Sequence, residues 1–214
     1  MPEPDDTPRE PRRQAERREE AEAALLQAAV VIITRHGAAG LTLAEVGAAA
    51  GYSRGLPAHY FGDKQGLLLA IVSYVTKRFA TSVARTYAPE PGLETLVTRI
   101  FHAYDRTLLQ RAGQDADLGA AALQYSLLEA LTNPALTQPI AKLNDSSTRT
   151  LERDLNTGIE RGEIRADADV KAEAAMILGT MRASIMQWVI DPEGTDIIAL
   201  RDAHCEAMRR DLAA

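Results

Sequence analysis

The sequence predicts an all-α protein with about nine helices. Apolar residues recur three and four positions apart along most of the 214 residues, which is the spacing of one face of a helix. No stretch of useful length alternates apolar and polar residues, so no strand is predicted. Glycine and proline residues interrupt the helical stretches. We therefore expect a three-helix N-terminal domain followed by a larger helical domain.

The chain begins with a predicted tail and a long helix. Residues 1–11 contain four prolines and no apolar anchor, which predicts a disordered tail. From residue 12 to residue 36 the apolar side chains repeat at helical spacing, and Gly37 and Gly40 end this helix.

The segment LTLAEVGAAAGYSRGLPAHYFGDK, residues 41–64, predicts two short helices over about 42–50 and 53–60. The small residues of the first helix allow two helices to approach closely, and Gly51 allows a left-handed turn between them. A short helix pair of this kind has the outline of a helix-turn-helix. The second helix of that motif lies in the major groove of DNA.

Three caps are predicted around these helices. Thr42 and Glu45 match a capping box, in which each side chain meets the backbone N–H of the other residue. Ser53 is expected to cap the second helix, and Asp63 the helix that follows. Lys64 lies in the first turn of that following helix, where a cation opposes the helix dipole, so we interpret it as a ligand for a DNA phosphate.

The rest of the chain is predicted to be helical. Asn133 is expected to cap a helix that opens with Pro134, and Pro139 predicts either a kink or a later start. Residues 172–190 are apolar nearly all round, which predicts burial on more than one side. The predicted helices cover about 63–87, 92–112, 115–131, 134–161, 167–190 and 194–212.

The charge of the chain is unevenly distributed. With 24 basic and 30 acidic residues the net charge is −6, which by itself argues against a nucleic-acid binder. Residues 9–64 carry eight basic and seven acidic residues, however, and are the least acidic part of the chain. An acidic body behind a locally basic surface is compatible with specific DNA binding.

Several classes of protein are disfavoured. The single cysteine, Cys205, excludes a disulfide framework and a cysteine-based zinc site within one chain, and indicates a reduced, cytoplasmic setting. No signal peptide is recognised, and no apolar run reaches the ~18 residues of a membrane span. The four histidines lack metal-ligand spacing, and no catalytic triad, carboxylate pair or P-loop is visible. We expect no enzymatic activity, no cofactor, no metal and no membrane partner.

Residues 18–75 resemble the DNA-binding domain of the TetR (tetracycline-repressor-like) family of transcriptional regulators. The matching parts are LTLAEVGAAAGYSRG, the sequence HYF, and the G-D-K-x-G-L-L opening of the next helix. The remainder matches only in length, helical content and the turn GIERGEI at 158–164. Pro57 and Ala58 depart from the family, which usually has leucine and tyrosine there. If Ser53 is the cap, Pro57 falls at the fourth helical position, so we expect a late start or a loosened first turn.

The resemblance implies a division into a tail at 1–11, a DNA-binding domain at 12–62, a connecting helix at 63–87, and an effector-binding and dimerisation domain at 88–214. It implies a ligand-responsive regulator, a repressor, which binds a palindromic operator in double-stranded DNA as a homodimer. Two copies would associate through the last two helices, and a small, largely apolar effector would release the operator.

The candidate DNA-binding residues lie in and beside the helix-turn-helix. Arg54 is the first choice for reading a base, because its guanidinium matches two acceptors of guanine. Gly55 permits close approach of the backbone to DNA. Leu56 can contact a thymine methyl group or belong to the core. Tyr60 is expected to contact a phosphate, and His59 is expected to lie near the bases. The full predicted set is Thr42, Ser53, Arg54, Gly55, Leu56, His59, Tyr60 and Lys64.

The N-terminal arginines allow two interpretations. Arg9, Arg12 and Arg13 could form an arm in the minor groove or a solvated helix start. Arg17 and Arg18 are interpreted as solvated, with acidic neighbours on the same helix.

The candidate effector-binding residues are aromatic, methionine and histidine side chains of the larger domain. Aromatic walls with a few polar groups suit a ligand pocket, although the same residues at helical spacing also build an ordinary core. The set is Phe101, His102, Tyr104, Tyr125, Met176, Met181 and Trp188.

Two other functions remain open at this point. The helical body could be a dimerisation or protein-docking module without a small ligand, in which case no metabolite would shift its melting temperature. Alternatively, the chain could be an all-α enzyme that acts on a small apolar substrate, in which case a co-purified ligand would be turned over.

Overall fold

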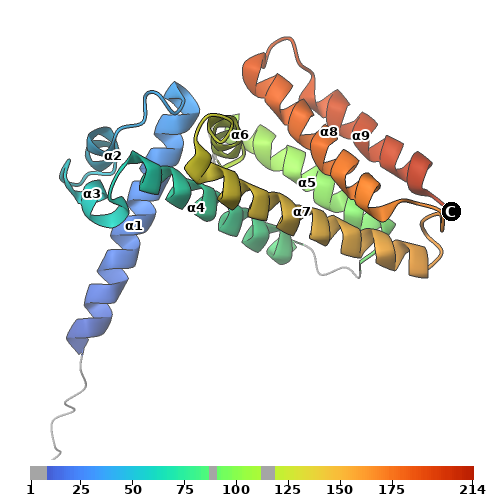
Figure 1. Cartoon of the computed structure of the whole chain (residues 1–214), viewed down its shortest axis with the longest axis horizontal. Coiled ribbons are helices and arrows are strands. Elements are labelled where there is room, and N and C mark those ends of the chain that lie inside the picture. The colour runs from blue at the N-terminus through green and yellow to red at the C-terminus, as the bar shows by residue number, and fades with distance from the viewer. Residues whose placement is uncertain (1–8, 87–90, 112–118) are drawn as a thin grey trace, which may run out of the picture. The chain divides into compact units, whose positions relative to one another are not determined.

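The computed structural model describes residues 9–86, 91–111 and 119–214, with side chains over 14–78, 91–105 and 122–214. In these ranges every regular element is a helix, apart from one isolated bridge between Ile164 and Ala213. The predicted all-α class is confirmed. The helices are α1 (Arg9–His36), α2 (Leu43–Ala49), α3 (Leu56–Phe61), α4 (Lys64–Thr86), α5 (Leu93–Arg111), α6 (Gly119–Glu129), α7 (Pro134–Glu160), α8 (Val170–Ile190) and α9 (Ile197–Leu212) (Figure 1).

The chain divides into two compact units, Met1–Ile71 and Val72–Ala214, and the boundary falls inside α4. The first unit contains α1, α2, α3 and the start of α4, with α2 packed on both α1 and α3. Its buried apolar side chains come from all parts of the unit: Leu25, Ala29, Ile33, Leu41, Val46, Leu67 and Ile71 are each fully buried.

Helix α1 begins at Arg9, three residues before the predicted start. Residues 9–11 are therefore helical, which corrects their assignment to the tail. Pro11 falls in the first turn, where the missing N–H has no helical partner to lose. Residues 1–8 lie outside the described part, and so do the side chains of Arg9, Arg12 and Arg13.

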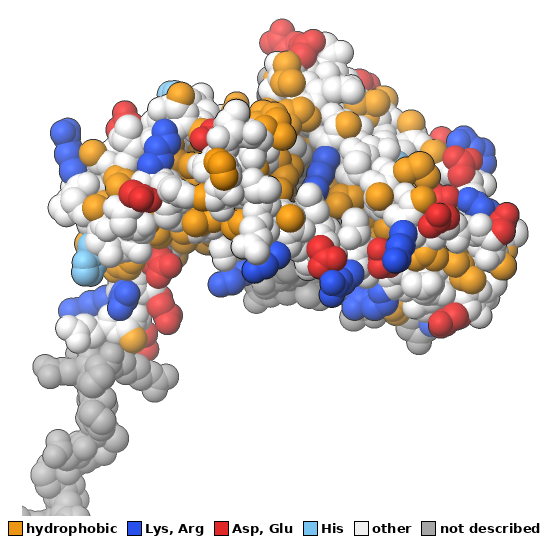
Figure 2. Space-filling view, viewed as in Figure 1, with side chains coloured by type: hydrophobic (Ala, Val, Ile, Leu, Met, Phe, Trp, Pro, Cys, Tyr) orange, Lys and Arg blue, Asp and Glu red, His pale blue; other side chains and the backbone are white. Residues whose placement is uncertain are grey.

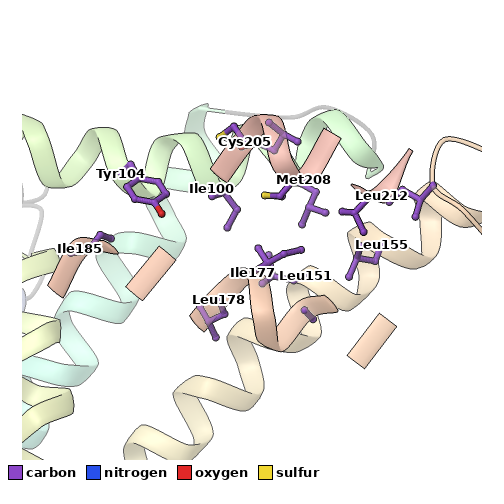
Figure 3. Packing of buried hydrophobic residues seen from close by; sticks show 14 of the residues in the cluster. Ile100, Tyr104, Leu151, Leu155, Ile177, Leu178, Ile185, Cys205, Met208 and Leu212 are labelled. Atoms are coloured by element: carbon purple, nitrogen blue, oxygen red, sulfur yellow. Dashed lines mark hydrogen bonds between the residues drawn. The ribbon is translucent and has the colours of Figure 1, made fainter. Parts of the chain in front are cut away.

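The second unit is a bundle of helices around one apolar core. Helix α5 packs on α6, α7, α8 and α9, and α8 packs on α6, α7 and α9. Figure 3 shows side chains from α5, α7, α8 and α9 pointing into a common interior, among them Ile100, Leu151, Ile177 and Met208. Burial of these apolar side chains is the main force that holds the helices together.

Three helices of this unit begin where a polar side chain caps them. Asn133 accepts from the N–H of Ala135 and α7 begins at Pro134, as predicted. The helix then continues through Pro139, so the predicted alternative of a later start is wrong. Helices α8 and α9 begin about three residues later than predicted, because Asp169 and Asp196 accept the first free N–H groups through their carboxylates.

Helix α8 is buried on one side only, which corrects the prediction for residues 172–190. Ile177, Ile185 and Trp188 are buried, whereas the opposite side is exposed and consists mainly of small residues. That exposed side is made of Ala172, Ala175, Met176, Gly179, Thr180, Ala183, Gln187 and Ile190.

Candidate nucleic-acid interface and effector domain

The candidate DNA-binding surface depends on a close contact between α2 and the chain that leads into α3. Gly47 of α2 is buried, and a Cβ added there would lie 2.5 Å from the carbonyl oxygen of Ser53 and 3.1 Å from the Cα of Arg54. Any side chain at residue 47 would therefore push this turn away. Gly51 has φ 77°, the left-handed conformation predicted for it. The close approach predicted from the small residues of α2 is confirmed.

Thr42 caps α2 as predicted. Its Oγ1 accepts from the N–H of Glu45 at 3.2 Å and donates to Oε2 of Glu45 at 2.8 Å. The carboxylate thus meets the hydroxyl of Thr42, whereas the capping box predicted a bond with its backbone N–H. Thr42 is exposed beside the positive end of a helix, so its role as a phosphate contact stays a prediction.

Helix α3 begins later than 53, and Ser53 is not its cap. The N-cap is Gly55, the first helical residue is Leu56, and Pro57 occupies the second helical position. A proline is tolerated there because that N–H has no partner inside the helix. The expected late start is confirmed. Ser53 instead accepts from the N–H of Leu56 through its backbone carbonyl, at 3.1 Å, and its side chain is exposed.

The exposed side of this region carries several of the predicted DNA contacts. Arg54 and Gly55 are exposed in the turn before α3, and His59 is exposed on the helix itself. Leu56 is half-buried and Pro57 is buried, with its Cδ turned toward Gly47. The geometry therefore places a guanidinium and an imidazole on one short exposed segment, the chemistry expected for contacts with base edges and phosphates.

Tyr60 is held against α1. Its hydroxyl donates to the carbonyl oxygen of Arg18 at 3.3 Å, and the guanidinium carbon of Arg18 lies 5.9 Å from the centre of its ring. His59 and Tyr60 make an edge-on ring contact at 5.8 Å but face different surroundings, since only His59 is exposed. Arg18 is exposed and lies beside α3. From the sequence it is expected to be a solvated residue at the start of the first helix. Only the fold brings it to α3.

Asp63 caps α4, as predicted. Its Oδ1 accepts from the N–H of Gly66 at 2.8 Å. A Cβ on Gly66 would lie 2.0 Å from the carbonyl oxygen of Phe61, which explains why glycine is needed in the G-D-K-x-G turn. Lys64 is the first residue of α4 and is exposed, so its ammonium group is available to a phosphate.

In the second unit the predicted effector residues occupy several environments. Tyr104 is fully buried (Figure 3). Its hydroxyl lies 3.1 Å from Nδ1 of His204, and burial raises the pKa of this hydroxyl. Phe101 is half-buried, with the guanidinium carbon of Arg201 at 4.1 Å from its ring centre and an edge-on contact to His102 at 6.1 Å.

The remaining predicted effector residues do not share one surface. Trp188 is buried in the core, and Met181 packs against that core. Tyr125 of α6 is half-buried. Met176 is 57% exposed on the outer side of α8. Their roles as ligand contacts stay predictions, and the exposed position of Met176 suits an intermolecular contact better than an internal one.

Cys205 and Arg182 are two polar residues of this unit with different surroundings. Cys205 is buried, its Sγ lies 3.9 Å from the carbonyl oxygen of Val97, and burial raises the pKa of the thiol, as for an unreactive cysteine. The sequence gives no signal for Arg182 of α8, because an arginine in a helix is ordinarily solvated. Here Nη1 donates to Oδ1 of Asn144 at 2.6 Å.

Acidic and basic side chains are interspersed on the face of the second unit shown in Figure 2. Within the described ranges, no cluster of three or more histidine, cysteine or carboxylate residues could hold a metal ion. No helix of the described chain is long and apolar enough to cross a membrane.

The chain is similar to known bacterial regulators over most of its length. Residues 25–71 match the family model of bacterial regulatory proteins of the tetR family, and residues 96–208 match the C-terminal region of YsiA-like proteins. The HTH-type transcriptional regulator BetI of Paraburkholderia phytofirmans is 31% identical over 169 residues, which cover 76% of this chain and 80% of the relative. The fatty acid metabolism regulator protein of Bacillus subtilis is 23% identical over 188 residues, which cover 86% and 91%.

Solved structures show the same fold. A regulator from Saccharomonospora viridis in complex with choline aligns with a TM-score of 0.77 at 19% identity, over 92% of this chain and 99% of that one. FadR of Bacillus subtilis in complex with stearoyl-CoA aligns with a TM-score of 0.68 at 24% identity, over 87% and 96%.

Proposed function

Because the chain belongs to the TetR family of DNA-binding transcriptional regulators, which are not enzymes, we propose that it is a cytoplasmic repressor controlled by a small ligand. It binds a palindromic operator as a homodimer, and a largely apolar effector releases it. The observation that carries the DNA-binding part is the exposed segment at the start of α3, held by the close contact at Gly47.

We assign recognition of the operator's base sequence to α3, and contacts with the DNA phosphates to residues at the neighbouring helix N-termini. Arg54 at the helix start reads a base, with His59 nearby and Gly55 allowing close approach of the backbone. Phosphates are contacted by Thr42 and Lys64, both exposed at helix N-termini. The hydroxyl of Tyr60 fixes α3 against α1 and keeps Arg18 beside it.

Dimerisation is assigned to the outer sides of α8 and α9. Six large hydrophobic side chains are exposed among the described residues, and three of them lie on these two helices: Met176, Ile190 and Ile198. The small residues of α8 between them would let a second copy approach closely. Two such helix pairs related by a two-fold axis form a four-helix bundle.

Effector control is assigned to the second unit. Related structures hold stearoyl-CoA or choline, so this fold accommodates small ligands of different chemistry. Helix α4 belongs to both units, and a ligand that favours one arrangement of the second unit can act on the DNA-binding unit through it. The operator is released when the two α3 helices of the dimer no longer match the spacing of its half-sites.

The experiment that tests this function is selection of bound sequences from random duplex DNA with the purified full-length protein near physiological salt. Recovery of a palindrome is expected, with half-sites one helical turn apart or a multiple of it. A folded, dimeric protein that enriches no sequence would contradict the proposal.

A further inference from the structure

One cation of the second unit, Arg182, forms no ion pair with the side chains that the structure describes. Arg182 lies between Leu178 and Ile185 on α8, four residues after the first and three before the second, so all three share one side of the helix. Leu178 and Ile185 are buried in the apolar core. The Nε atom of Arg182 is also buried and makes no hydrogen bond within the described structure. Burial lowers the pKa of this guanidinium.

The other arginines with little exposure in this unit are paired. Arg99 donates to the fully buried Asp154 at 2.8 Å. Arg201 lies against Asp105 and 2.8 Å from Asp202. For Arg182 the described residues provide no carboxylate within ion-pair distance, and its one hydrogen-bond partner is the neutral amide of Asn144 on α7. A buried charge without a counterion is costly, so such a group calls for a ligand that supplies one.

Arg182 and Asn144 offer a ligand almost only hydrogen-bond donors. The buried Nε–H of Arg182 has no partner, and Asn144 uses its side-chain oxygen on Arg182, which leaves the donor NH2 group of that amide. Together they match the oxygens of a carboxylate or a phosphate, which guanidinium groups bind in a forked geometry.

We propose that Arg182, supported by Asn144, binds the acidic group of an amphiphilic effector, a carboxylate or a phosphate at the end of an apolar chain. The assignment rests on the proposed effector-controlled function and narrows it, because a cationic effector would be repelled here. The apolar part would lie along the side of α8 that carries Leu178 and Met181.

The test compares three probes that share one alkyl chain: decanoate, decyl phosphate and 1-decanol, each below its micellar concentration. Binding to the full-length dimer is measured by calorimetry, and release of the selected operator by fluorescence anisotropy. At least one of the two acids should bind roughly tenfold or more tightly than the alcohol, since hydrogen bonds to charged groups contribute that much. Comparison of decanoate with decyl phosphate shows whether the site prefers a carboxylate or a phosphate.

The variant Arg182→Gln should bind the preferred acid roughly tenfold to a hundredfold more weakly and leave alcohol binding unchanged. The matched control is Arg149→Gln on α7, whose side chain is 73% exposed and should keep the preference. Arg182→Met should also raise the melting temperature of the ligand-free protein, because it removes a half-buried charge that has no described counterion. A purely structural arginine would lower it.

Other outcomes would overturn the inference. Equal binding of the acids and the alcohol, or an acid preference that persists in Arg182→Gln, would show that Arg182 does not form an anion site. If the alcohol then still released the operator, the proposed effector-controlled function would be retained. If Arg182→Gln weakens the dimer in sedimentation and keeps the acid preference, the arginine pairs with a second copy instead. If none of the probes binds while the operator is bound, the amphiphilic acid is excluded and effector control itself fails for this class of ligand.

Discussion

Arg54 and Arg182 show how burial separates two residues of the same type. Arg54 is exposed in the turn before α3, where its charge is hydrated and free to meet DNA. Arg182 is half-buried on α8, and its guanidinium donates to the neutral amide of Asn144 on α7. The first suits recognition of a large anionic partner from outside, and the second suits capture of a small anion inside the unit.

Replacing Arg54 by alanine should weaken operator binding roughly tenfold to a hundredfold, because a forked contact with guanine contributes about 1–3 kcal/mol of discrimination. The protein should remain a dimer, since the side chain is exposed and lies outside the helices assigned to dimerisation. Gel-shift titration with the selected operator measures the loss, and the exposed Arg149→Ala serves as control. Unchanged affinity would remove Arg54 from the site.

The buried His204 should make stability depend on pH. Burial lowers its pKa below 6.5, so between that value and the lower folded pKa the unfolded chain binds more protons. The free energy of unfolding therefore falls as pH drops from about 6.5 through the folded pKa. Denaturant unfolding at several pH values should show a shallower decline for His204→Gln than for wild type. The exposed His36→Gln should follow wild type; parallel curves for His204→Gln would refute this account.

At the scale of elements, the helix-turn-helix is fixed by backbone proximity rather than by large side chains. The Cα of Gly47 is close enough to the turn before α3 that a Cβ would contact backbone atoms, which cannot move aside as a flexible side chain can. Pro57 then limits α3 to a short helix that starts at Leu56. The exposed segment at residues 53–55 is a consequence of both features.

Substitution of two glycines distinguishes an effect on stability from an effect on operator binding. Gly47→Ala should destabilise the protein by about 1–3 kcal/mol through overpacking. Gly55→Ala should preserve or raise stability by about 0.4–1 kcal/mol, because no atom lies within 4 Å of the added Cβ and φ is −87°. Chemical denaturation measures both. Operator binding by Gly55→Ala then reports whether the backbone approaches DNA there; equal stability of the two variants would contradict the packing argument.

At the scale of the molecule, the exposed apolar residues of α8 and α9 are the surface to which we assign the proposed dimer contact. Met176→Asp should raise the dimer dissociation constant at least tenfold, which is about 1.4 kcal/mol, because it would bury a carboxylate in the interface. Leu131→Asp is the matched control, since Leu131 is 80% exposed but lies between α6 and α7. Sedimentation at several concentrations measures both. A dimer weakened only by Leu131→Asp would place the interface elsewhere.

The amino-acid sequence by itself determined the helical class, the order of helices and the helix-turn-helix, because these depend on local spacing, caps and glycine turns. It located Thr42, Asn133 and Asp63 as caps and foresaw the late start that Pro57 imposes on α3. It could not show that Arg18 lies beside Tyr60, that α8 keeps one side exposed, or that Arg182 is half-buried with no counterion among the described residues. Those facts depend on which residues distant in sequence meet after packing, and only the tertiary structure decides which charges and apolar faces remain without a partner.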